Sequence, residues 1–494
     1  MRFCRFRLVA TRASVLLAAV ILLIAPAPAA SQQADAAGAG SGAGDGSRPV
    51  PYPVLESAAF IRAVEAGTRT RTGQPGPRYW QPYAEYRLRA ELDTAARVVR
   101  GSGTIRYHNR SPRALPVLVL NLYQNLHRPG AERRRVVPVT GGIRLERVAV
   151  QGRELPELGP LGGGEAGWFE DGTLGAVRLP APLAPGDTVE LQLQWSYDVP
   201  PLGAPRNGTE GVVFLIAYWY PQLAVFDDVD GWALDPYRGN GEFYMGYADY
   251  EVELDVPAGF LVGATGTLAN AEEVLSPETR RRLERARSTG DVVRVVTEAE
   301  RGRETRPAES GRHVWRFRAE QVRDFAWGAS GLYLWDATRA IVRRESGGAD
   351  TVAIHSLYRP NARNWQESAG YLRNAIQFLS DYLWPYPYPV MSMVEGIVAG
   401  GMEYPMLTAI NGPLDAAGLF ALTVHETAHM WFPMLVGSNE RRYAWQDEGL
   451  ASFLTDLAIR ARNPDRNPGR STQHAYLNDV EAGGEVELMR HADL

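Results

Sequence analysis

Three long stretches of the chain alternate apolar and polar residues, and this alternation constrains the fold more than any other feature. The stretches are "YRLRAEL" (86–92), "TVELQLQWSYDV" (188–199) and "YEVELDV" (250–256). A period of two places successive side chains on opposite faces of a strand, as in an antiparallel sheet with one buried face. The inward face of the second stretch would hold Val189, Leu191, Leu193, Trp195, Tyr197 and Val199. We therefore expect a large antiparallel β domain over residues 83–337.

Residues 270–310 interrupt this pattern and are rich in Arg and Glu, so we interpret them as a solvated, helix-prone insertion. From residue 338 the apolar period becomes three and four, which predicts a mostly helical domain over 338–494. One helix would bury Trp365, Ala369, Leu372, Ile376, Leu379 and Leu383, and "PYPYP" (385–389) would end it. A second is expected from about Leu419 to Phe432. A third would start near Trp445 and bury Leu450, Phe453, Leu454 and Leu457.

The first 30 residues have the pattern of an export signal. Arg2, Arg5, Arg7 and Arg12 precede the apolar run "ASVLLAAVILLIA" (13–25), and "APAAS" (27–31) offers small residues for cleavage. The run is short for a membrane span, although an uncleaved anchor is the alternative. Residues 31–82 begin with a Gly/Ala/Ser-rich segment and are expected to be a flexible tether and lead-in. We expect a periplasmic or secreted protein with no stable membrane span after cleavage.

Composition excludes several kinds of chemistry. All 52 basic residues are Arg, so a Schiff-base lysine and a phosphate-loop lysine are both excluded. The net charge of −5 and the lack of a basic cluster argue against a nucleic-acid partner. Cys4 is the only cysteine and lies inside the signal. The mature protein therefore has no disulfide and no thiolate ligand, and its stability must come from its core.

The segment "VHETAHM" (424–430) places two histidines four residues apart with a glutamate between them. On a helix His425 and His429 would share one face and could bind one zinc ion, leaving a position for water. Zinc lowers the pKa of such a water to about 7, so Glu426 could take its proton. Glu448 lies 19 positions after His429 and could return to the metal through a helical hairpin. A chance match is the alternative, and the third ligand argues against it.

These motifs resemble those of the gluzincin zinc aminopeptidases, the family of alanyl aminopeptidase and leukotriene epoxide hydrolase. The resemblance lies in HExxH followed by Glu in "WQDEGLA" (445–451), and in "GGMEYPM" (400–406), which is similar to the family's Gly-x-Met-Glu-Asn exopeptidase motif. The segments "WYPQLAVFDD" (219–228) and "GEFYMGYADYEV" (241–252) are similar to its N-terminal domain. The resemblance implies an α+β multidomain protein, in which a saddle-like β domain precedes a thermolysin-like zinc domain.

The resemblance also implies roles for individual residues. His425, His429 and Glu448 would hold one zinc ion per chain, and Glu426 would be the general base. Glu403 would hold the free α-amino group of a peptide, so that one residue is removed at a time.

The remaining substrate contacts depend on the same motif. Gly400, Gly401 and Met402 would lie along the substrate as a strand edge. A buried turn glutamate is the alternative for Glu403. Tyr404 stands where the family has Asn, which leaves the detail of amine binding open. Glu210 is the nearest candidate for a second amine-binding residue from the β domain.

The expected protein is thus an exported zinc aminopeptidase acting on peptides with a free N-terminal amine. The alternatives are a zinc endopeptidase of the same superfamily and a weakly active or inactive family member that acts as a binding protein. In the family a tyrosine further beyond the third ligand than the 46 residues after Glu448 stabilises the oxyanion. Tyr476 is the only tyrosine in that remainder and is interpreted as structural. We therefore expect a C-terminally incomplete catalytic domain. The preferred N-terminal side chain and the oligomeric state are not indicated.

Overall fold

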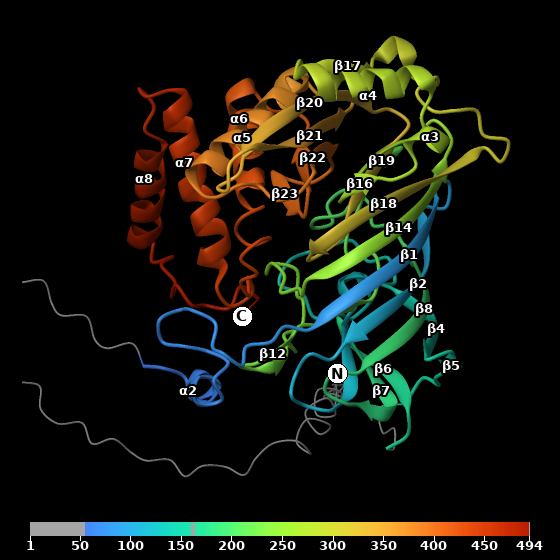
Figure 1. The fold of residues 1–494 in the computed structure, drawn as a ribbon, viewed down its shortest axis with the longest axis vertical. Coiled ribbons are helices and arrows are strands. Elements are labelled where there is room, and N and C mark those ends of the chain that lie inside the picture. The colour runs from blue at the N-terminus through green and yellow to red at the C-terminus, as the bar shows by residue number, and fades with distance from the viewer. Residues whose placement is uncertain (1–54, 160–163, 494) are drawn as a thin grey trace, which may run out of the picture.

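The computed structural model describes residues 55–159 and 164–493. Figure 1 shows strands of the first half of the chain, blue to green, crossing one part of the molecule, and helices of the last third, orange to red, in the other. The expected export signal and the low-complexity start of the expected tether lie outside the described residues. Within the described ranges, no helix has both the length and the apolar character needed to cross a bilayer.

The alternating stretches form the centre of an eight-stranded sheet, in the order β16-β18-β14-β1-β2-β8-β4-β5. Its strands are β1 (Tyr83–Asp93), β2 (Val98–His108), β4 (Arg144–Val150), β5 (Arg153–Glu154), β8 (Thr188–Asp198), β14 (Ala248–Pro257), β16 (Thr267–Leu268) and β18 (Arg312–Val322). Neighbouring strands are antiparallel except β1 and β14, which are parallel. The expected antiparallel sheet is therefore wrong in this one pair, because the chain returns to the sheet beside β1 after a long excursion.

The inward face of β8 is buried as its alternation predicts, including Val189, Leu191, Leu193, Trp195 and Tyr197. Nε1 of Trp195 donates to the carbonyl oxygen of Trp219 at 2.6 Å, which satisfies the buried indole. Gly101 of β2 pairs with Trp195 across the sheet. A Cβ at Gly101 would lie 2.1 Å from the indole, so this position must lack a side chain for the ring to fit.

Smaller sheets complete the first part of the chain. One has the order β15-β19-β10-β9, another the order β11-β3-β7-β6, and β12 pairs with β13. Their bounds are β3 (Leu115–Asn121), β6 (Gly167–Asp171), β7 (Leu174–Leu183), β9 (Gly208–Glu210), β10 (Val213–Ile216), β11 (Gln222–Leu223), β12 (Phe226–Asp227), β13 (Gly231–Trp232), β15 (Leu261–Ala264) and β19 (Trp327–Ser330). A 3₁₀ helix, η2 (Tyr123–His127), follows β3.

The last third of the chain combines a six-stranded sheet with helices. The sheet has the order β17-β20-β21-β22-β24-β23. Its strands are β17 (Val293–Val296), β20 (Leu334–Arg343), β21 (Ala349–Tyr358), β22 (Val390–Gly396), β23 (Gly401–Tyr404) and β24 (Leu407–Asn411). The helical elements are η4 (Trp365–Glu367), α5 (Ser368–Tyr382), α6 (Ala416–Ala428), the π-helix η5 (Trp445–Gly449), α7 (Leu450–Arg462) and α8 (Pro468–Glu481). The expectation of a mostly helical region is thus corrected to a sheet covered by helices.

The charged segment 270–310 is more than a solvated insertion. It contains α3 (Ala271–Val274), α4 (Pro277–Thr289) and η3 (Glu298–Glu300), and its strand β17 pairs with β20 in the six-stranded sheet. The buried valines of β17 explain this pairing. The strand was not predicted because it is short and lies between charged residues. The domain boundary expected at residue 337 falls inside β20.

Two helices differ in detail from their expected limits and faces. The helix α5 buries Ala369, Leu372, Ile376 and Leu379, and the preceding η4 buries Trp365, as expected, while Leu383 is half-buried. The helix α6 ends at Ala428 and continues into turns, rather than running to Phe432. In α7, Phe453 is 54% exposed, whereas Ala451, Leu454, Thr455 and Ala458 face inward. The buried face of α7 includes small residues and Thr455. A prediction based only on large apolar residues therefore assigns the wrong face.

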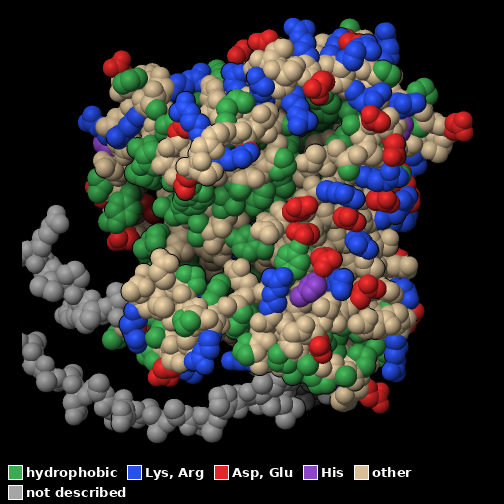
Figure 2. Space-filling view, viewed as in Figure 1, with side chains coloured by type: hydrophobic (Ala, Val, Ile, Leu, Met, Phe, Trp, Pro, Cys, Tyr) green, Lys and Arg blue, Asp and Glu red, His purple; other side chains and the backbone are tan. Residues whose placement is uncertain are grey.

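Figure 2 shows apolar side chains gathered on the face that carries α7 and α8, above a hollow in the surface. Phe453 of α7 and Tyr476 and Leu477 of α8 are among the exposed large apolar residues. No residue of α8 is buried among the described residues.

The part of the expected tether that the structure describes is ordered by specific contacts. Helix α2 (Ala58–Glu65) is capped by Ser57, whose hydroxyl oxygen accepts from the amide of Phe60 at 3.1 Å. Nη2 of Arg69 lies 2.6 Å from a carboxylate oxygen of Asp228 beside β12. Residues 58–65 thus form a helix and Arg69 contacts the residue after β12, whereas the sequence predicted a flexible tether up to residue 82.

A buried arginine joins the first and last parts of the chain. Arg323, directly after β18, donates to Glu440 at 2.7 Å and to the carbonyl oxygens of Met245, Pro433 and Ser438 at 3.0, 3.1 and 3.3 Å. Both members of the ion pair are buried. Burial of such a pair requires that the remaining donors also find partners, which the three carbonyls provide.

We expect Arg323→Ala to lower the free energy of unfolding by about 3–5 kcal/mol, because it leaves the buried carboxylate of Glu440 unpaired. Urea denaturation followed by circular dichroism measures this change. Arg318→Ala is the matched control, since Arg318 of β18 makes an exposed pair with Glu251 at 3.6 Å. Its effect should be several times smaller. Equal losses in the two variants would contradict a dominant role for the buried pair.

Candidate functional site

Helix α6 places His425 and His429 on one face, one turn apart. Its first turn is capped by Asp415, whose carboxylate accepts from the amide of Gly418 at 2.6 Å. The Nε2 atoms of the two histidines lie 3.3 Å apart. The HExxH spacing therefore brings two imidazole nitrogens to one point, as the sequence predicts.

Glu448 completes a three-donor set from the π-helix η5. Its Oε2 lies 3.2 Å from Nε2 of His425 and 4.0 Å from Nε2 of His429. Tetrahedral zinc with bonds of about 2.0–2.2 Å would hold its donors about 3.3 Å apart, so the set fits such an ion. Glu448 is half exposed, which leaves one side of the set open to solvent and substrate.

The other ring nitrogens of the two histidines are engaged by the protein. Nδ1 of His429 lies 2.7 Å from Oδ1 of Asp447 and 3.0 Å from the carbonyl oxygen of Phe432. Nδ1 of His425 lies 3.5 Å from Oγ1 of Thr455. A proton held on Nδ1 leaves the lone pair of Nε2 free for a metal, and such outer contacts orient the rings.

Glu426 is buried beside the donor set, under strand β23. A Cβ at Gly401 would lie 2.1 Å from Oε1 of Glu426, so the strand can pass over this carboxylate only because residue 401 is glycine. Burial raises the pKa of Glu426 to about 7, against the opposing effect of His429 and His425. The hydrogen bond with His425 lowers the pKa of Glu448 to about 2. Two neighbouring carboxylates thus differ strongly in proton affinity, one suited to exchange protons and one to remain charged.

Glu403 lies on β23 with its side chain buried. Its Oε1 has no hydrogen-bond partner among the described residues, and it lies on a strand rather than in a turn. Burial raises the pKa of Glu403 well above its usual range, while His429 opposes this shift and Glu242 adds to it. A buried carboxylate without a partner is costly unless a cation fills the site.

Strand β23 is the edge of the six-stranded sheet. It pairs with β24 on one side, and Gly400, with φ of +92°, precedes it. Met402 is buried on this strand. Such an edge offers backbone groups with which an extended peptide can pair.

The structure adds acidic residues that the sequence reasoning missed. One carboxylate oxygen each of Glu242, Glu403 and Glu440 lie within 4.8 Å of one another, and a similar group joins Glu403, His429 and Asp447. Glu242 is paired with Arg206. Asp447 directly precedes Glu448 in "WQDEGLA". This position next to an expected ligand was the one feature of the sequence that could have indicated its place in the site.

Three other residues singled out from the sequence are engaged elsewhere. Glu210 pairs with Arg359 at 2.6 Å. Tyr404 is buried, and its hydroxyl donates to the carbonyl oxygen of Arg206, which joins β23 to the loop before β9. Tyr476 lies exposed on α8 and donates to Glu485 at 2.7 Å.

No protein-family model matches the chain. Among curated proteins, Aminopeptidase M1-B of Oryza sativa subsp. japonica is 32% identical over 129 residues, which are 23% of this chain and 14% of that protein. The chain therefore matches only a small part of this relative.

Solved structures cover much more of the chain. The M1 zinc metallopeptidase from Deinococcus radiodurans is 17% identical, with a TM-score of 0.50 over 81% of this chain and 75% of that chain. A mutant of that protein bound to a Tyr-Ser-Ala substrate is 16% identical, with a TM-score of 0.51 over the same shares. The family resemblance seen in the motifs is thus confirmed at the level of the fold: the chain has the fold of the M1 zinc metallopeptidases.

Proposed function

We propose that this protein is an exported zinc aminopeptidase that removes the N-terminal residue from peptides. The observation that carries the proposal is the buried carboxylate of Glu403, whose Oε1 has no hydrogen-bond partner among the described residues, beside an open three-donor set. The donor set fits a catalytic metal, and the carboxylate fits a substrate ammonium.

His425, His429 and Glu448 are the proposed ligands of one zinc ion. Two neutral imidazoles and a carboxylate suit zinc, and an open side is typical of catalytic rather than structural sites. When bound, zinc supplies Lewis acidity toward water and the peptide carbonyl. Asp447 and Thr455 orient the two rings, and Glu426 accepts and returns the proton that hydrolysis moves.

Glu403 and Glu242 are proposed to receive the α-ammonium group. Because Glu403 is fixed on β23, it sets the distance from the amine to the first peptide bond. The backbone of Gly400, Gly401 and Met402 would pair with the extended substrate. The bound peptide of the Deinococcus radiodurans neighbour supports a peptide as the substrate class.

The two alternative functions are less well supported. An endopeptidase would place an uncharged backbone segment beside Glu403, which would leave the buried carboxylate without a cation. A binding protein without turnover would not need the proton acceptor Glu426 next to an intact donor set. The donor set, Glu426 and Glu403 together support the aminopeptidase proposal over both alternatives.

The metal site and the base can be separated by two substitutions. His429→Ala should remove bound zinc and turnover together, because one of three ligands is lost. Glu426→Gln should keep about one zinc per chain and lose turnover by about 10²–10⁴-fold, since only proton transfer is removed. Atomic emission measures zinc, and fluorogenic aminoacyl substrates measure turnover.

His474→Ala is the control for the metal measurement, because His474 lies exposed on α8. It should keep both the metal and the activity. Equal zinc contents in the His429→Ala variant and the wild type would overturn the ligand assignment.

The amine anchor is tested by comparing a peptide with its N-acetylated form. The unmodified protein should cleave the free-amine peptide at least about tenfold better, and Glu403→Gln should reduce this preference, because a charged hydrogen bond is lost. The ratio of kcat/KM values for the two peptides measures the effect. Equal cleavage of both peptides by the wild type would contradict the exopeptidase assignment.

Export is proposed from the basic and apolar pattern of residues 1–30. Expression of the full chain in a bacterial host should give a mature protein outside the cytoplasm that starts near Ser31. N-terminal sequencing checks the cleavage site. A protein that keeps its first 30 residues and sediments with the membrane would instead support an uncleaved anchor.

A further inference from the structure

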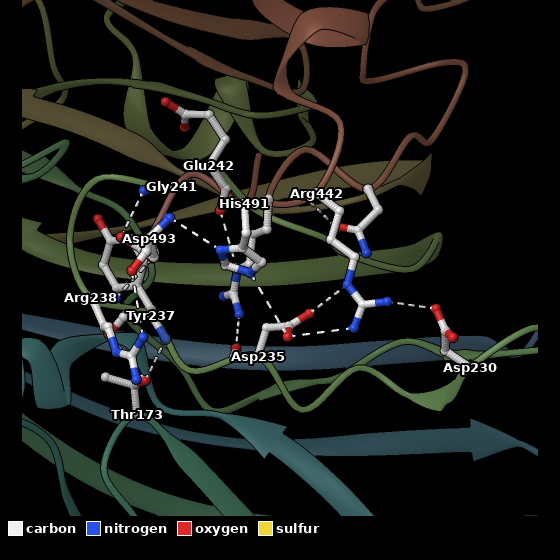
Figure 3. Close-up of polar contacts among 12 residues, drawn as sticks. Thr173, Asp230, Asp235, Tyr237, Arg238, Gly241, Glu242, Arg442, His491 and Asp493 are labelled. Atoms are coloured by element: carbon white, nitrogen blue, oxygen red, sulfur yellow. Dashed lines mark hydrogen bonds and ion pairs between the residues drawn. The ribbon is translucent and has the colours of Figure 1, made fainter. Parts of the chain in front are cut away.

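Asp493 is buried against a loop that lies more than 250 residues earlier in the chain, and its carboxylate is surrounded by backbone amides of that loop. Only 1% of the residue is exposed. Its Oδ2 accepts from the amide of Arg238 at 3.0 Å, and its Oδ1 accepts from the amides of Asn240 and Gly241 at 2.9 and 3.0 Å. Figure 3 shows this carboxylate enclosed by the loop that carries Arg238 and Gly241. Three amides on one carboxylate define the path of the loop closely.

Further contacts hold Asp493 itself in place. The amide of Ala492 donates to the carbonyl oxygen of Arg441 at 2.9 Å, and Nε of Arg134 donates to the carbonyl oxygen of Asp493 at 3.0 Å. A Cβ at Gly241 would lie 3.1 Å from Oδ2 of Asp493, so the loop approaches as closely as glycine allows. The segment 491–493 thus connects the loop to the turns that follow the metal-binding helix.

The loop leads directly to Glu242. Residues 233–247 contain no helix or strand, so no ladder of hydrogen bonds fixes Glu242. Its carbonyl oxygen accepts from Nε of Arg441 at 3.3 Å, and its carboxylate pairs with Arg206. Figure 3 shows the Glu242 side chain directed away from Asp493. One of its carboxylate oxygens lies within 4.8 Å of oxygens of Glu403 and Glu440.

We propose that Asp493 is a positioning residue for substrate recognition, which acts by fixing the loop 238–241 and thereby placing the carboxylate of Glu242 beside Glu403. This inference rests on the proposed aminopeptidase function. The hydrogen bonds of Asp493 described above go to the loop 238–241 and to Arg134, and none goes to His425, His429 or Glu448. The effect of Asp493 is therefore on binding of the N-terminal ammonium and not on the metal or the proton acceptor.

Substitution of Asp493 should separate KM from kcat. Asp493→Ala should raise KM for a free-amine peptide about tenfold or more, because Glu242 loses its fixed position, while zinc content stays at one per chain and kcat changes less. Asp493→Asn keeps an oxygen for Asn240 and Gly241 and should give an intermediate KM. Asp465→Ala, at an exposed aspartate after α7, is the control and should match the wild type.

A double substitution distinguishes positioning from general destabilisation. In the Glu242→Gln background, Asp493→Ala should raise KM little further, because both changes remove the same interaction. Additive effects of the two substitutions would overturn the proposal and leave the aminopeptidase assignment intact.

A binding measurement covers the case of weak turnover. Calorimetry with a free-amine dipeptide in the Glu426→Gln background should show affinity reduced about tenfold or more by Asp493→Ala. Equal affinities with and without Asp493→Ala would overturn the positioning role alone. Absence of binding by the Glu426→Gln parent, together with no turnover by the wild type, would overturn both this inference and the proposed function.

Discussion

The concentration of buried carboxylates around two imidazoles is the constraint on which the site depends. Glu242, Glu403, Glu426, Glu440 and Asp447 gather in a small volume where water cannot screen their charges. Each buried charge needs a cation, a proton or several donors to be tolerated. Arg323 serves Glu440 and Arg206 serves Glu242. The remaining negative potential favours the binding of a cation at this centre.

This electrostatic requirement also explains why residues far apart in the sequence meet here. Arg323 follows a strand of the eight-stranded sheet, yet its carboxylate partner Glu440 lies beyond helix α6. Tyr404 of β23 is hydrogen bonded to the backbone of Arg206, and Asp493 is bound by amides of the loop before Glu242. Loops that connect β strands of the first half of the chain therefore supply part of the wall of the site. Without the first part of the chain, Glu440 would lose its buried ion pair with Arg323.

Features of the fold and of the site that depend on residues close together in the sequence could be predicted, whereas those that depend on distant residues could not. The i, i+4 spacing of His425 and His429 fixes their relative position on any helix, so the sequence predicted this part of the site correctly. The alternation in β8 likewise predicted its buried face. The positions of Glu242 and Asp493 could not be predicted, because the contact between loop 238–241 and residue 493 spans more than 250 residues of chain. The same holds for β17, whose partner β20 is 40 residues away and whose valines are surrounded by charge.

The absence of lysine, which first looks like a bias of composition, has a consequence inside the molecule. The guanidinium of Arg323 serves one carboxylate and three carbonyl oxygens at once, and that of Arg206 serves Glu242, the hydroxyl of Tyr237 and the carbonyl of Asn240. An ammonium group has three donors at a single point and cannot reach partners spread over a plane. Each of these arginines joins segments that approach from different directions, so a lysine of equal charge would leave carbonyls unsatisfied. The two planar guanidinium groups thus neutralise Glu440 and Glu242 and also hold the neighbouring segments in place.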